Sequence, residues 1–111
     1  MKISEIAREL QLKAVYEDFK DNEVSGAYTS DLLSDVMANA QESQILITIQ
    51  AHKNTVAVAS LMGASAILIC NNRPLSTDMV DAAREEGIPI FLSPNSQYTM
   101  SGKLWVLLGE K

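Results

Sequence analysis

Residues 47–72, ITIQAHKNTVAVASLMGASAILICNN, contain the pattern that decides the fold class. The apolar runs ILITI (residues 45–49) and AILIC (66–70) have the length and composition of buried strands. Between them, residues 54–62 are rich in alanine and valine, and Gly63 follows as a typical helix stop. A strand, a helix and a second strand of these lengths predict a right-handed crossover that joins two parallel strands.

The same alternation continues on both sides of this stretch. Downstream, we predict a helix at residues 77–86 between Ser76 and Gly87, a strand at 88–92 and a last helix at 96–108. Upstream, we predict a helix at residues 5–12 capped by Ser4, strands at 13–16 and 23–28, and a helix that follows Thr29 or Ser30 and ends near residues 39–42.

The chain has no linker or low-complexity tract, so residues 1–111 are expected to form a single domain. The order of the elements predicts an α/β fold of three layers, with a mostly parallel sheet and flanking helices. Four methionines at helical spacing are predicted to fill the core: Met37, Met62, Met79 and Met100.

Composition narrows the possible partners and compartments. The net charge is −5 and the chain has no basic run, which argues against nucleic acid and anionic membranes as partners. The lone cysteine, Cys70, cannot form an internal disulfide and is expected to be a buried, inert thiol. The chain shows neither a signal-peptide pattern nor an apolar run long enough to span a membrane, so we expect a cytoplasmic protein.

Polar residues follow the predicted parallel strands and mark a candidate ligand site. Because the carboxyl ends of parallel strands meet at one edge of the sheet, the loops after residues 49 and 70 are expected to lie close together. An anionic metabolite or nucleotide is the expected ligand, held by Arg73 and free helix amides. Each residue also has a structural interpretation, since asparagine and serine are common in turns and helix caps. The candidate ligand-binding residues are Thr48, Gln50, His52, Asn54, Asn71, Asn72 and Arg73.

No complete catalytic group is present in the sequence. His52 has no second histidine or cysteine pair with which to form a zinc site, and no glycine-rich phosphate-binding loop occurs. Asp31 and Asp35 lie one helical turn apart, and helix capping and a solvated helix face explain them. We therefore predict a protein that is not an enzyme and needs neither cofactor nor metal.

The last predicted helix is more apolar than a helix that covers a sheet requires. Two helices of this kind, at residues 54–62 and 96–108, predict a two-fold homodimer. The alternative is that Leu104, Leu107 and Leu108 pack inward while Trp105 lies flat on the surface. The apolar or aromatic residues that span more than one stripe of the last helix are Tyr98, Met100, Leu104, Trp105, Leu107 and Leu108.

The segments SDLLSDVMANA, ITIQAHKNTVAVASL and ASAILICNNRPLSTDMVDAAREEGIPIFLS resemble the DRTGG domain family, most strongly over residues 29–93. The family is similar in fold to the N-terminal domain of the serine kinase/phosphorylase that acts on the phosphocarrier protein HPr. It also occurs beside CBS domain pairs. The Asp-Arg-Thr and Gly-Gly motifs of the family name are replaced here by residues 50–54 and by Asn71-Asn72, whereas Arg73-Pro74 matches the basic-Pro step that follows the glycines.

The resemblance implies a non-catalytic regulatory or partner-binding module, expected to be a homodimer; a larger enzyme or regulatory complex is the further partner that it implies. The alternative is a small-molecule binding protein that uses the loops at the carboxyl ends of the strands.

Overall fold

A five-stranded sheet forms the centre of the computed structural model, which describes residues 1–109. The strand order is β1-β5-β4-β3-β2, and all neighbouring pairs are parallel except β1 with β5. The elements, in chain order, are α1 (Ile3–Glu9), β1 (Lys13–Ala14), β2 (Gly26–Thr29), α2 (Leu33–Asn39), β3 (Gln44–Thr48), α3 (Lys53–Met62), β4 (Ala66–Ile69), α4 (Thr77–Glu86), β5 (Ile90–Leu92) and α5 (Gln97–Leu107).

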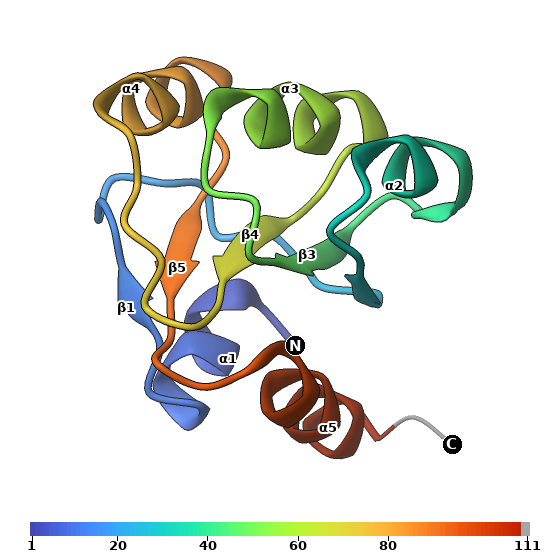
Figure 1. Ribbon diagram of the computed structural model, residues 1–111. Helices are drawn as coiled ribbons and strands as arrows, with labels where there is room; N and C mark the ends of the chain where they lie inside the picture. The colour runs from blue at the N-terminus through green and yellow to red at the C-terminus, as the bar shows by residue number, and fades with distance from the viewer. Residues whose placement is uncertain (110–111) are drawn as a thin grey trace.

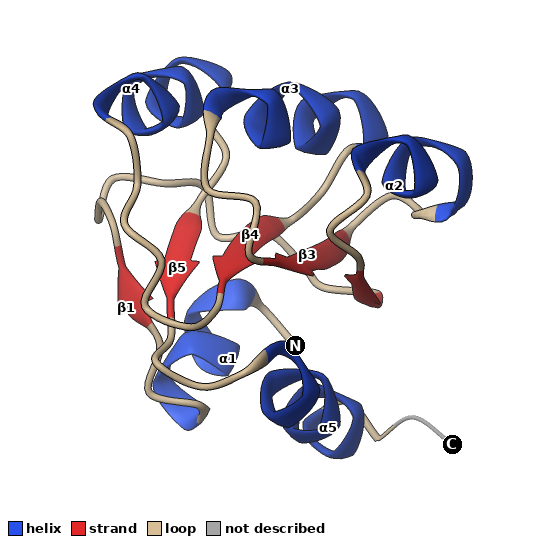
Figure 2. Ribbon diagram, in the orientation of Figure 1, coloured by secondary structure: helices blue, strands red, loops and turns tan. Residues whose placement is uncertain are grey.

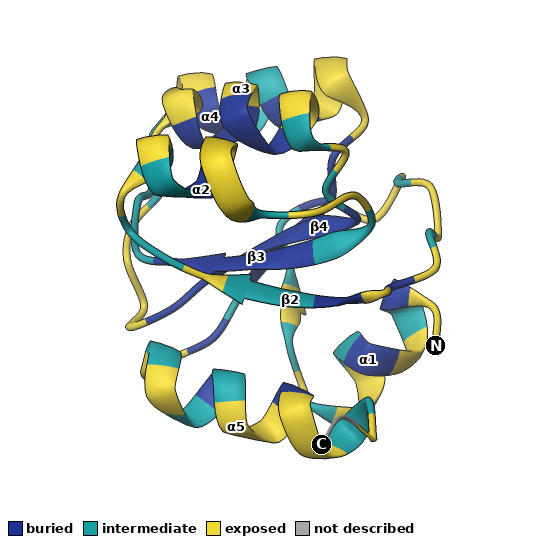
Figure 3. Cartoon of the chain, turned by 90° about the vertical axis from the view of Figure 1, so that its right-hand side faces the viewer, coloured by how far each residue is buried: buried dark blue, intermediate teal, exposed yellow. Residues whose placement is uncertain are grey.

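The predicted three-layer α/β architecture is confirmed. Helices α2, α3 and α4 cover one face of the sheet, and α1 and α5 cover the other (Figures 1 and 2). The predicted core strands at residues 45–49, 66–70 and 88–92 correspond to β3, β4 and β5, which pair side by side. Figure 3 shows β3 and β4 buried between the two helical layers, which explains why their sequences are apolar on both faces.

Helices α3 and α4 end at the two glycines that the sequence predicts as helix stops. Gly63 and Gly87 end these helices with φ values of 72° and 71°, in the left-handed region that glycine adopts without strain. Helix α4 has the predicted bounds, and Ser76 occupies its N-cap position although its side chain makes no capping hydrogen bond.

The N-terminal third differs most from the predicted bounds. Helix α1 begins at Ile3 with Lys2 at its N-cap, so Ser4 does not cap it. The amide and hydroxyl of Ser4 donate instead to the Asp21 carboxylate, at 2.9 and 2.6 Å. The strand predicted at residues 13–16 ends at Ala14, although the Val15 amide still donates to the Ile90 carbonyl at 2.9 Å. The Tyr16 hydroxyl donates to the Ile88 carbonyl at 2.6 Å.

The starts of β2 and α2 also differ from the predicted ones. Strand β2 begins at Gly26 rather than at residue 23, because Glu23 forms an isolated bridge with Lys2. The N-cap of α2 is Leu32, so neither Thr29 nor Ser30 caps that helix. The Ser30 hydroxyl accepts from the Leu32 amide at 3.2 Å and so closes the turn that leads into α2.

The methionine prediction is correct at two positions. Met79 and Met100 are fully buried, whereas Met37 is 59% exposed, so its assignment to the core is wrong. Helix α2 lies at the edge of its layer and buries only Val36 completely, which leaves Met37 on the outer side. Met62 is half-buried and packs beside Val36, Leu46 and Val58.

Cys70 is fully buried, as predicted. Burial, with a smaller contribution from the negative charge of Asp31, raises the pKa of the Cys70 thiol to about 11. The thiol therefore stays protonated at neutral pH and packs as a small apolar group.

Within residues 1–109, no helix combines the length and apolar character needed to cross a membrane.

Candidate functional site

The connections that leave the carboxyl edge of the sheet diverge between β4 and β5. The chain leaves β4 toward α4 on one face and leaves β5 toward α5 on the opposite face (Figure 1). In α/β sheets, ligands bind where successive connections diverge in this way. The predicted ligand-binding residues follow β3 and β4 at this edge, so the edge is the candidate functional site.

The loop after β4 has a backbone shape that favours glycine. Asn71 and Asn72 both have positive φ, at 62° and 52°, and their amides donate to the carbonyls of Asn95 and Ser93 at 3.0 and 3.1 Å. Asparagine tolerates this conformation better than most residues with a side chain. The Asn-Asn pair therefore occupies positions that a glycine pair would also suit.

Asp31 organises the neighbouring part of the edge. Its Oδ1 accepts from the Thr48 hydroxyl at 2.9 Å and the Ile49 amide at 3.0 Å, and its Oδ2 accepts from the Gln97 side-chain amide at 3.0 Å. Burial acts to raise the pKa of the Asp31 carboxyl. The three hydrogen bonds and the positive charge of Arg73 outweigh burial, so the pKa lies below its usual value.

The sequence interpretation of Asp31 as a helix-capping or merely solvated residue is therefore wrong. Its partners lie 17 to 66 positions away along the chain, so no local spacing reveals them. Asp35 also has specific partners, because its carboxylate accepts from the Tyr28 hydroxyl at 2.8 Å and from Asn39 at 2.9 Å. Gln97, which sequence reasoning did not select, belongs to the site because its side-chain amide donates to the Asp31 carboxylate.

Gln50 connects the Asp31 cluster to the histidine. The Gln50 side-chain amide nitrogen donates to the Asp31 carbonyl at 2.9 Å, which leaves its Oε1 as an acceptor facing His52 Nε2 at 3.0 Å. This arrangement assigns the proton of the neutral imidazole to Nε2 and leaves Nδ1 as an acceptor. Thr48, Gln50 and His52 thus belong to one hydrogen-bonded cluster, whereas Asn54 is an exposed residue on the first turn of α3.

Arg73 and Asn72 line a separate, open cavity of about 400 Å³. The cavity lies between the loop after β4, strand β1 and the end of β5. Gln50 and His52 are not part of its lining, so a single pocket shared by His52 and Arg73 stays a prediction. The complete lining is Lys13, Ala14, Val15, Asn72, Arg73, Pro74, Leu75, Val80 and Leu92.

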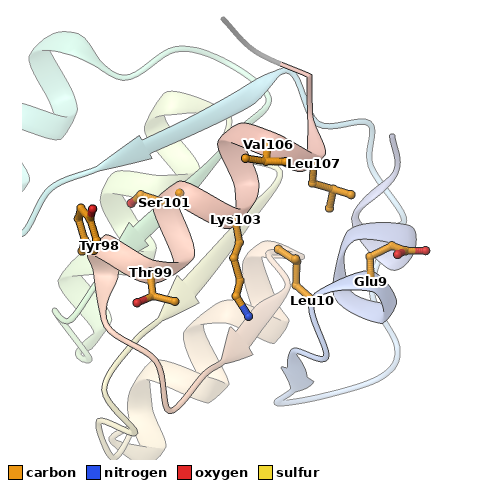
Figure 4. Close-up of a pocket in the computed structure, with 9 residues that line it drawn as sticks. Glu9, Leu10, Tyr98, Thr99, Ser101, Lys103, Val106 and Leu107 are labelled. Carbon is orange, nitrogen blue, oxygen red and sulfur yellow. The ribbon is translucent and has the colours of Figure 1, made fainter.

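A second surface feature is a groove along the outer side of α5. The groove has a volume of about 890 Å³ and is formed by α5 and the end of α1 (Figure 4). Tyr98 is 90% exposed and Val106 is 77% exposed, while Trp105 beside them is half-exposed. Leu104 is buried and Leu107 and Leu108 are half-buried, so the leucines pack inward as the alternative prediction for this helix states.

Metal-binding side chains do not cluster among the described residues. Within residues 1–109, no three histidine, cysteine, aspartate or glutamate side chains converge as they would to hold a metal ion.

Comparison with known proteins bears on the fold. No family model and no curated protein matches the sequence. Among solved structures, the chain is similar to the CBS and DRTGG domains of the regulatory region of Clostridium perfringens pyrophosphatase, with a TM-score of 0.66 and 17% sequence identity. The match covers 94% of this chain and 45% of that one, so this chain spans less than half the length of its neighbour. At this identity the similarity concerns the backbone alone: the chain shares its α/β fold with part of a CBS- and DRTGG-containing regulatory region.

Proposed function

We propose that the chain is a non-catalytic regulatory or partner-binding module that acts as a two-fold homodimer. The observation that carries this proposal is the exposed apolar face of α5. Tyr98, Trp105 and Val106 are spaced seven and eight residues apart, so they lie on one side of the helix. Aromatic residues of this kind are enriched at the centres of protein interfaces.

A second copy of the chain is the partner that this face fits. Glu9 and Lys103 are the two charged residues of the groove, and within residues 1–109 they do not pair with each other. A surface that meets its own copy across a two-fold axis must be complementary to itself, which one acid and one base on the same patch satisfy. Gly102 lies between Tyr98 and Val106 on the same side of α5, and its small size permits a second helix to approach closely.

The absence of catalysis is part of this proposal. The carboxylate at the sheet edge, Asp31, already accepts three hydrogen bonds, which suits an anchoring role better than proton transfer. The thiol of Cys70 is buried and protonated. We therefore expect purified protein to show neither ATP hydrolysis nor phosphoryl transfer.

Sedimentation velocity across micromolar concentrations tests the dimer. We expect the wild-type protein to sediment as a dimer and Val106→Glu to shift the equilibrium strongly toward monomer. Leu32→Glu is the matched control, because Leu32 at the start of α2 is also an exposed apolar residue, at 64%, and belongs to neither helix of the predicted contact. A wild-type protein that stays a 12.1 kDa species as its concentration rises contradicts the dimer.

Charge variants test the orientation of the contact. Lys103→Glu leaves two acids on each groove and should weaken association. The double variant Glu9→Lys/Lys103→Glu restores one acid and one base and should recover it. Equal weakening by the single and the double variant would argue against a self-complementary contact.

A second candidate function is the binding of an anionic small molecule at the carboxyl edge of the sheet. The observation that favours it is the position of Arg73 in a cavity between the loop after β4, strand β1 and the end of β5. The regulatory region of similar fold was solved with its activator, diadenosine tetraphosphate, which carries a polyphosphate between two nucleosides. An anionic ligand for this chain, such as a nucleotide, agrees with both facts.

A further inference from the structure

The cavity lined by Arg73 combines positive charge with an apolar wall. Lys13 and Arg73 are its charged residues, and no carboxylate contributes to its lining. The chain as a whole has 14 acidic and 9 basic residues, so the charge of this cavity is opposite to that of the average surface. Such a cavity attracts anions, and the planar guanidinium of Arg73 can hold two oxygens of one anionic group.

The remaining lining determines what the anion must carry. Leu75, Val80 and Leu92 are half-buried residues of the cavity, and Pro74 adds a rigid apolar surface at its rim. A volume of about 400 Å³ falls within the ~300–1,000 Å³ typical of small-molecule sites. An inorganic ion would leave this apolar wall exposed to water, whereas an organic anion would cover it.

The fold fixes the backbone positions from which the two cationic side chains extend. Lys13 is paired with Leu92 in the β1–β5 ladder, and Arg73 follows the Asn71-Asn72 turn that is hydrogen-bonded to the loop after β5. Strand β1 is antiparallel to β5, so its first residue lies at the carboxyl edge of the parallel strands. Residues far apart in the chain thus meet at one cavity.

We propose that this cavity binds an organic anion whose phosphate, sulfonate or carboxylate group lies between Lys13 and Arg73 and whose apolar body packs on Leu75 and Val80. The inference rests on the second candidate function and gives it a definite place. The proposed site does not include Gln50 and His52, which do not line the cavity; their side chains bond to each other, and the Gln50 side chain also donates to the Asp31 carbonyl.

A pair of probes that differ only in charge provides the test. The probes are 8-anilinonaphthalene-1-sulfonate and its uncharged analogue N-phenyl-1-naphthylamine, each added to ¹⁵N-labelled wild-type protein. We expect the sulfonate to shift the backbone amide signals of Lys13, Arg73 and Val80. The uncharged analogue should leave these signals in place.

Two double variants then test whether the affinity for the sulfonate depends on the charge in the cavity or only on the net charge of the protein. Lys13→Gln/Arg73→Gln should lower the affinity for the sulfonate at least tenfold. Lys2→Gln/Arg8→Gln removes the same charge from exposed positions on and beside α1 and should change that affinity less than twofold. The four side chains are exposed, so both variants are expected to fold, and the dispersion of the amide signals verifies this.

The outcomes distinguish failure of this cavity as the site from failure of small-molecule binding itself. Unchanged affinity in Lys13→Gln/Arg73→Gln, or equal shifts by both probes, overturns the cavity as an anion site. Shifts confined to residues 50–52 keep small-molecule binding but move it to the Gln50–His52 cluster. A wild-type protein that binds no sulfonate at millimolar concentration overturns both. Sedimentation of the same samples decides the dimer independently.

Discussion

Gln97 at the start of α5 donates a hydrogen bond to the carboxylate of Asp31, which precedes α2, over a distance of 3.0 Å. The two helices cover opposite faces of the sheet (Figure 1). Asp31 also accepts from Thr48 and from the Ile49 amide at the end of β3. One carboxylate therefore joins both helical layers to the edge of the sheet.

Asp31→Ala is expected to lower the free energy of unfolding by about 1–3 kcal/mol at neutral pH, because it leaves three donors without their acceptor. Urea denaturation measures the loss. Asp81→Ala, an exposed aspartate on α4, is the control and should change stability by less than about 0.5 kcal/mol.

The same variant has a defined pH dependence. The pKa of Asp31 is lower in the folded protein than its usual value, so its ionised form stabilises the fold above that usual value, near pH ~4. This contribution declines as the pH falls through the folded pKa. The stability difference between wild type and Asp31→Ala should therefore shrink in acid, and a difference that grows between pH 5 and pH 3 would contradict the assignment.

Gly102→Ala is expected to stabilise the isolated chain by up to about 1 kcal/mol, because alanine favours the interior of a helix. A Cβ at Gly102 meets no atom within 4 Å, so the change causes no clash within the chain. Gly63→Ala should have the opposite effect, since Gly63 has φ of +72° and an added Cβ lies 3.0 Å from Glu42 Cγ. Thermal unfolding of both variants, at a concentration where the protein is monomeric, measures the two signs.

Asn72→Gly should be tolerated, whereas Asn72→Ala should cost about 1 kcal/mol, because alanine resists the left-handed backbone conformation at this position. Asn54→Ala, on the exposed first turn of α3, serves as the reference for loss of an asparagine side chain. Chemical denaturation of the three variants gives the ranking. Equal stability of the glycine and alanine variants would argue against the left-handed turn.

Cys70 is expected to resist thiol reagents in the folded protein. Its pKa of about 11 keeps the reactive thiolate scarce at pH 8, and burial blocks access. Modification by Ellman's reagent should therefore follow unfolding rather than precede it. Because the folded pKa is raised, ionisation of this thiol in the unfolded chain should lower stability as the pH rises from about 9 toward 11.

The sequence predicts the sheet well because its signals are local. The apolar runs that became β3 and β4, and the glycines that end α3 and α4, each act within a few residues. The position of the strand-end loops followed from the parallel topology. The grouping of Lys13 with Arg73 did not, because it depends on the antiparallel return of β1 beside β5, and a strand of two residues leaves almost no sequence pattern.

Side-chain partners were least predictable. Asp31 precedes a helix, where an aspartate commonly stabilises the helix end, and this local explanation concealed contacts with residues 48, 49 and 97. Met37 fits a helical stripe by spacing, but the stripe cannot show that α2 lies at the edge of its layer. Spacing defines the faces of a helix, whereas the number of neighbours around it depends on the whole fold.

The strand order also implies an order of events during folding. Strands β2, β3 and β4 each pair with the next strand along the chain, so this part of the sheet can grow by successive, comparatively short loop closures. Strand β1 instead pairs with β5 near the other end of the chain, through two residues. We expect the N-terminal segment to join last, and the amides of β1 to exchange with solvent hydrogen at lower opening free energies than those of β3 and β4.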